Sequence, residues 1–138
     1  MTSAPARWLI KSEPQKYSFA DLVSEGKTIW DGVRNNQAAL YLKAMKVGDE
    51  ALFYHSVSDL AVVGIAKVSR EAFLDPTDEK ARFVAVEFAP VRALASPVPL
   101  SALKAHPDLA AMAMFRQFRL SVCPITEPEW QVIVGMGG

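Results

Sequence analysis

The chain has few of the residues that build disulfides, metal centres or strongly charged surfaces. It contains one cysteine and two histidines in 138 residues, too few for an internal disulfide and without the ligand spacing of a zinc site. Its 15 basic and 15 acidic residues cancel, so no bulk positive field exists to hold a long polyanion. We therefore expect no cofactor and no metal, and any contact with nucleic acid has to be local.

Long apolar runs are also missing. No stretch approaches the roughly 20 apolar residues that span a membrane, and the start of the chain lacks the apolar core of a signal peptide. The composition is nevertheless 51% apolar, which is enough for one domain with a sizeable core. We expect a flexible tail at 1–6 and a single domain at 7–138, in a monomeric protein of the cytoplasm, or of the nucleus if its source is a eukaryote.

Hydrophobic periodicity and turn residues predict a block of strands in the middle of the chain. Strands are expected at 7–11, 51–55, 61–73, 82–94 and 118–125. Gly64 predicts a bulge or bend within its strand, and Pro97 and Pro99 are expected to break the strand pattern after residue 94.

Short helices are expected on both sides of this block. Ser18, Asn35 and Thr126 are each placed to cap a helix N-terminus, and Ser101 is expected to cap a further short helix. Helices before and after a run of strands are typical of an α+β domain, here built on a small, strongly curved mixed sheet.

Four segments together supply aromatic rings and polar side chains, with the rings in the first three. They are Trp8 with 11–14, then 30–35, 53–56 and 119–122. Rings supply flat faces on which a planar ligand stacks, whereas Asp, Asn, Ser and main-chain groups hydrogen-bond its edge. The mixture suits a nucleobase taken out of its stack, provided that the fold gathers the four segments.

These segments, in this order, closely resemble the EVE domain family, and the resemblance covers nearly the whole chain from Trp8 onward. It implies a PUA-like β-barrel with short peripheral helices. It also implies binding of modified bases, notably cytosine altered at its 5-position in DNA, and for some small bacterial members an association with RNA.

The predicted base pocket combines rings with short polar groups: Ser12, Trp30, Asp31, Asn35, Phe53, Tyr54 and Ser121. Trp30 is the expected stacking wall at the edge of a loop, and Ser12 is the expected reader of the base edge. Phe53 and Tyr54 are neighbours on one strand, so one faces inward and the other outward, and the sequence leaves open which.

Three basic residues, Lys11, Arg34 and Arg119, are expected to contact phosphate or the base edge. An arginine fork matches phosphate oxygens, although a surface salt bridge would account for either arginine equally simply. Asn35 likewise has two possible roles, because a helix cap accounts for it without any ligand.

Three functions remain open at this point. The expected one is a non-catalytic module that binds a modified base in DNA or RNA. An enzyme acting on a modified nucleoside or a small amide would use Lys11, Glu13 or His55 for proton transfer. A protein-interaction module would instead use its exposed aromatic residues as a hot spot. Cys123, in an apolar strand, is expected to be a buried packing residue rather than a nucleophile.

Overall fold

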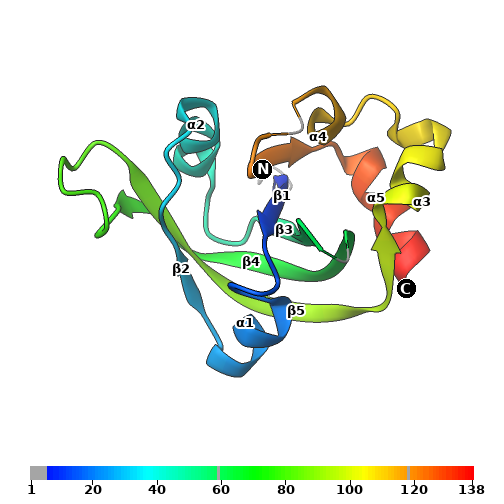
Figure 1. Ribbon diagram of the computed structural model, residues 1–138, viewed down its shortest axis with the longest axis horizontal. Helices are drawn as coiled ribbons and strands as arrows, with labels where there is room; N and C mark the ends of the chain where they lie inside the picture. The colour runs from blue at the N-terminus through cyan, green and yellow to red at the C-terminus, as the bar shows by residue number, and fades with distance from the viewer. Residues whose placement is uncertain (1–5, 59, 118) are drawn as a thin grey trace, which may run out of the picture.

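The computed structural model describes residues 6–58, 60–117 and 119–138, whose six strands form one mixed sheet (Figure 1). The strands are β1 Arg7–Ser12, β2 Thr28–Trp30, β3 Glu50–His55, β4 Ala61–Leu74, β5 Val84–Pro99 and β6 Val122–Ile125. Their order across the sheet is β2-β5-β4-β3-β1-β6, with β1 parallel to β3 and the other neighbours antiparallel. Among these residues the two edge strands, β2 and β6, do not pair with each other. The expected α+β fold on a mixed sheet is confirmed, but the sheet stays open and does not close into a barrel.

Helices lie around the sheet and at its ends. They are α1 Phe19–Glu25, α2 Asn36–Ala44, α3 Leu100–Ala105, α4 Ala113–Arg116 and α5 Glu127–Gly137, with a short 3-10 helix η1 at Pro107–Leu109. Figure 1 shows α3 and α5 together beside the end of β5, whereas α1 lies near β2 and an earlier part of β5. Within the described part of the chain, no helix is long and apolar enough to cross a membrane.

Three helix starts follow the predicted caps. The Ser18 hydroxyl accepts from the N–H of Asp21, and the Thr126 hydroxyl accepts from that of Glu129, each within a reciprocal capping box. Asn35 Oδ1 accepts from the N–H of Ala38 at 3.0 Å. The three predicted caps are confirmed. They could be predicted because a capping bond joins residues three positions apart, so its donor and acceptor both lie in the local sequence.

The core centres on the rings around β3. Phe53 is fully buried and packs edge-on against Phe19, with 5.3 Å between ring centroids. A Cβ at Gly64 would lie 2.5 Å from the Phe19 ring, so this position has no room for a side chain. The register of β4 shifts between Val62 and Gly64, which confirms the predicted bulge.

The expected break at Pro97 and Pro99 is wrong, because β5 continues to Pro99. In the pairing with β4, Val98 lies opposite Val62 and Ala93 lies opposite Gly64. Residues 94–97 therefore bulge out opposite the single residue Val63. Pro97 is tolerated in the strand because no ladder partner in β4 needs the N–H that it lacks.

Other boundaries also differ from the prediction. Ser101 lies inside α3, which starts after Pro99 and has no side-chain cap. The last strand starts at Val122, and residue 118 of the predicted strand lies outside the described residues. Trp30 ends the short strand β2 and pairs with Val86, whereas the sequence predicted a loop.

The start of the domain is held by a buried carboxylate. Asp49 accepts from the N–H of Ala6 at 3.0 Å and from the indole N–H of Trp8 at 3.1 Å. Trp8 is a core residue. Of the predicted tail, residues 1–5 lie outside the described residues, whereas Ala6 is bonded to the domain.

Candidate functional site

A cavity of about 530 Å³ lies between the end of β1, the strand β2 and the loop that follows β2, and we call it the Trp30 cavity. Its volume falls within the range of about 300–1,000 Å³ that is typical of small-molecule sites. Six of the ten predicted site residues line it: Lys11, Ser12, Trp30, Asp31, Arg34 and Ser121. Glu13, Tyr17, Thr28 and Gly32 line it as well.

Two buried rings, Phe53 and Phe88, pack against Trp30. Its ring meets Phe53 at 5.6 Å and 85°, and Phe88 at 5.7 Å and 82°. Edge-to-face contacts of this kind are favourable and fix the plane of the half-buried indole. Phe53 therefore supports Trp30 from within the core and is not one of the residues that line the cavity.

Ser12 and Tyr17 form another part of the wall. The Ser12 hydroxyl donates to the carbonyl of Tyr17 at 2.5 Å, so toward a ligand it can act only as an acceptor. The Tyr17 hydroxyl donates to Glu25 at 2.6 Å. Burial, together with this carboxylate, raises the pKa of Tyr17 to about 12, so the phenol is neutral at ordinary pH. Tyr17 was not predicted, because nothing in its local sequence marks it.

The main chain of Lys11 is hydrogen-bonded to the segment just before β6. Its N–H donates to the carbonyl of Ser121 at 2.9 Å, which brings Ser121 beside Ser12 at the cavity. Burial lowers the pKa of the Lys11 amine. Glu13 forms an ion pair with Lys16 at 3.1 Å. Asp31 lines the cavity, is exposed, and makes no hydrogen bond or ion pair with the described residues.

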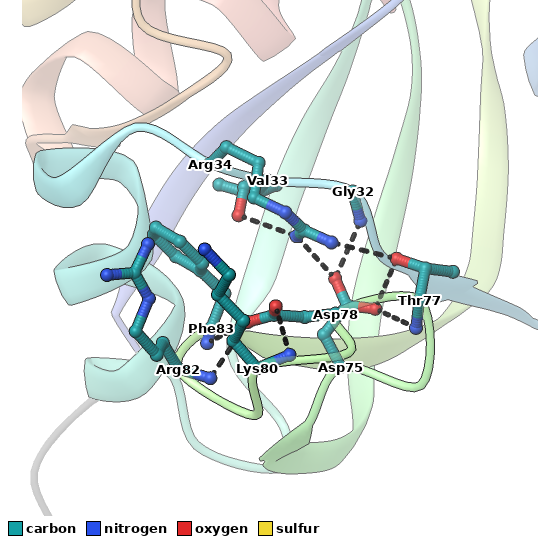
Figure 2. A network of polar contacts seen from close by, with 9 residues as sticks. All are labelled: Gly32, Val33, Arg34, Asp75, Thr77, Asp78, Lys80, Arg82 and Phe83. Atoms are coloured by element: carbon teal, nitrogen blue, oxygen red, sulfur yellow. Dashed lines mark hydrogen bonds and ion pairs between the residues drawn. The ribbon is translucent and has the colours of Figure 1, made fainter.

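A buried carboxylate, Asp75, fixes the loop that closes the cavity (Figure 2). One of its oxygens accepts from the N–H of Gly32 at 2.8 Å and from Arg34 at 2.9 Å, and the other accepts from Thr77. Burial opposes ionisation, but these bonds outweigh it and hold the pKa of Asp75 well below its ordinary range. Arg34 also donates to the Thr77 hydroxyl at 3.1 Å, so its fork is largely taken up inside the protein.

The expected strands at 61–73 and 82–94 leave 75–77 in the connection between them, with no role in the predicted site. A short polar pair such as Asp75 and Thr77 does indicate a side-chain-closed turn. Gly32, however, lies 43 positions before Asp75, and no local pattern connects the two. Gly32 has a φ of 76°, a conformation that favours glycine and directs its N–H toward the carboxylate.

Four predicted residues lie off the Trp30 cavity. Phe53 is in the core, and Asn35 uses its side-chain oxygen to cap α2. Tyr54 and Arg119 line a neighbouring hollow. The prediction that Phe53 or Tyr54 faces outward is wrong, since they are 0% and 1% exposed. Segments around β3 cover both of its faces, which an isolated strand pattern does not show.

Cys123 and His55 are not among the residues that line the Trp30 cavity. Burial raises the pKa of the Cys123 thiol from 9.0 to about 11. His55 accepts from the N–H of Phe19 at 3.1 Å. Among the described residues, no three His, Cys, Asp or Glu side chains lie together as metal ligands. The arrangement offers one indole face, several acceptors and a partly buried amine, which is a set that can stack and hydrogen-bond a planar polar ring.

Comparison with known proteins places the chain in a family. The EVE domain model matches residues 6–136. Thymocyte nuclear protein 1 of Mus musculus is 36% identical, covering 94% of this chain and 72% of its own length. The solved structure of Rpa0253 from Rhodopseudomonas palustris is 46% identical, with a TM-score of 0.92 over 96% of this chain and 93% of its own.

A further solved structure carries a ligand. It is human THYN1 in complex with 5-methylcytosine-containing DNA, 31% identical with a TM-score of 0.90, covering 96% of this chain and 97% of its own. The family match spans every residue of the sheet and of the Trp30 cavity lining. The chain belongs to the EVE domain family.

Proposed function

We propose that this protein binds nucleic acid carrying a modified base and that the base leaves its stack to enter the Trp30 cavity. The observation that carries the proposal is the fixed indole of Trp30, held by Phe53 and Phe88 beside the acceptors Ser12 and Asp31. Stacking a base on an aromatic side chain contributes about 1–3 kcal/mol. The DNA complex of the human relative supports a DNA ligand for this chain as well.

A cytosine derivative suits the polar groups of the cavity. Its exocyclic amine has two N–H donors, and both the Ser12 hydroxyl and the Asp31 carboxylate can accept from them. A 5-methyl group buried against apolar wall atoms adds about 0.8 kcal/mol, which is roughly a fourfold preference over unmodified cytosine. Larger or polar substituents at the same position can increase that preference.

We infer that the module binds its ligand without catalysis. One observation favours the alternative, an enzyme acting on a modified nucleoside or a small amide. Burial lowers the pKa of Lys11, and Glu13 lies on the same wall, so a proton donor and a proton acceptor both face the cavity. Incubation with modified nucleosides and mass spectrometry separates the two functions. A binding module returns every nucleoside with its mass unchanged. Turnover that disappears in Lys11→Ala or Glu13→Gln would establish the enzyme instead.

The binding test compares two half-buried aromatic residues. Trp30→Leu keeps apolar bulk against Phe53 and Phe88 but removes the stacking face. Tyr41→Leu is the matched control, because Tyr41 packs on Trp8 and does not line the Trp30 cavity. With an oligonucleotide containing one 5-methylcytosine, Trp30→Leu is expected to weaken binding about tenfold or more, and Tyr41→Leu to leave it unchanged. Equal affinities for both folded variants would remove Trp30 from the site.

A further inference from the structure

A second hollow, of about 510 Å³, adjoins the Trp30 cavity, and we call it the Tyr54 hollow. It shares three wall residues with the cavity: Lys11, Glu13 and Ser121. Its other walls include Tyr54, Val57, Leu60 and Arg119. These three shared residues place the two hollows next to each other.

Tyr54, one of the residues that line this hollow, carries a buried hydroxyl that makes no hydrogen bond to the described residues. Tyr54 is 1% exposed, and its hydroxyl has no hydrogen-bond partner among the described residues. It is the single buried side-chain polar atom of the described chain in that condition. Folded proteins rarely leave a buried polar group unpaired. Such a group loses its hydrogen bond to water on folding, and without a new partner this loss lowers stability.

The remaining walls resemble those of a nucleotide site. Val57 and Leu60 offer apolar surface, and Val57 is 73% exposed. Val57 also has a φ of 74°, a strained conformation for a β-branched residue, and such strain is concentrated at functional sites. Arg119 is exposed and forms no ion pair with the described residues, so its guanidinium can bind a phosphate.

We propose that the Tyr54 hollow binds the nucleotide next to the modified base. The neighbouring base packs on Val57 and Leu60, the Tyr54 hydroxyl bonds to its edge, and Arg119 binds the linking phosphate. This inference rests on the proposed function, because the first base has to occupy the Trp30 cavity. It predicts that recognition extends over two nucleotides and depends on what flanks the modified base.

The test uses Tyr54→Phe with ligands of two lengths. The probes are the nucleoside 5-methyl-2′-deoxycytidine and dinucleotides that carry thymidine on its 5′ or its 3′ side, titrated by NMR. One of the dinucleotides should bind the wild type at least tenfold more tightly than the nucleoside does. Tyr54→Phe should weaken that dinucleotide about three- to tenfold, the loss of one hydrogen bond, and leave the nucleoside affinity unchanged. Arg119→Gln should behave in the same way.

Thermal stability gives an independent readout. Removing an unpaired buried hydroxyl should leave the melting temperature of Tyr54→Phe unchanged or raise it. A lowered melting temperature would show that the hydroxyl has a partner inside the folded protein, and that would overturn the inference. Equal affinities for nucleoside and dinucleotides would overturn the second site alone, whereas no binding of the nucleoside would overturn the proposed function as well.

Discussion

Replacing Asp75 with asparagine tests how the cavity loop is held. The substitution keeps the size of the side chain but turns one acceptor oxygen into a donor. In either orientation the new amide group faces a main-chain N–H, that of Gly32 or that of Thr77. A buried N–H left without an acceptor costs about 1–3 kcal/mol. The lost ion pair with Arg34 adds less than a fully buried pair would, because the Arg34 side chain is 40% exposed.

We therefore expect Asp75→Asn to lower the free energy of unfolding by about 2–4 kcal/mol in urea titrations. Affinity for a 5-methylcytosine oligonucleotide should fall with it, because Gly32 and Arg34 frame the Trp30 cavity. Asp78→Asn is the control: Asp78 accepts from the N–H groups of Lys80, Arg82 and Phe83 in the same β4–β5 loop but does not line the cavity. It should leave affinity unchanged.

The acid limb of the stability curve gives a second readout of Asp75. The pKa of Asp75 is lower in the folded protein than its ordinary value of 3.8. Ionised Asp75 therefore stabilises the folded state at any pH above 3.8. This stabilisation is lost as the pH falls below 3.8 toward the lowered folded value, and Asp75→Asn should abolish that part of the pH dependence. Stability within 0.5 kcal/mol of wild type, with an unchanged acid limb, would refute the role given to Asp75.

Three further outcomes are expected. Gly64→Ala should destabilise the protein by about 1–3 kcal/mol, because the new Cβ would overlap the Phe19 ring. Gly135→Ala, in open space on α5, is the control and should be neutral or stabilising. Equal melting temperatures for the two variants would contradict the close contact between Gly64 and Phe19. The free energy of unfolding should decline as the pH rises from 9.0 toward 11, because burial raises the pKa of Cys123 in the folded protein over that range. Cys123→Ala should flatten this decline. An identical decline in the variant would show that other groups cause it. The logarithm of oligonucleotide affinity should fall only gently with the logarithm of salt concentration, with the slope of about one to three phosphate contacts, since the net charge is zero; a slope corresponding to six or more would reveal a longer basic track.

Predictions from sequence succeeded where the cause was local. The caps at Ser18, Asn35 and Thr126 were found because donor and acceptor lie three residues apart. The bulge at Gly64 was found because glycine weakens a regular strand and is common where a strand bulges or bends. The aromatic and polar segments of the Trp30 cavity were identified from their residue types and then from the family resemblance, and the fold does bring most of them together.

Predictions failed where the cause was distant in the chain. Strand β2 has only three residues, and its pairing with β5 gives it a partner that no local pattern reveals. Pro97 fits inside β5 only because of the register between β5 and β4. The contact between Asp75 and Gly32 joins two loops through the tertiary fold. Each of these depends on long-range packing, which determines strand pairing and loop contacts more strongly than intrinsic propensity does.

A crystal structure of this protein with an oligonucleotide containing one 5-methylcytosine would test the proposed base site most directly. We expect the modified base to lie outside its stack, with its ring against Trp30 and its exocyclic amine within hydrogen-bonding distance of Ser12 or Asp31. A base that remains stacked in the nucleic acid, or that is bound elsewhere while the Trp30 cavity holds no part of the ligand, would contradict this expectation.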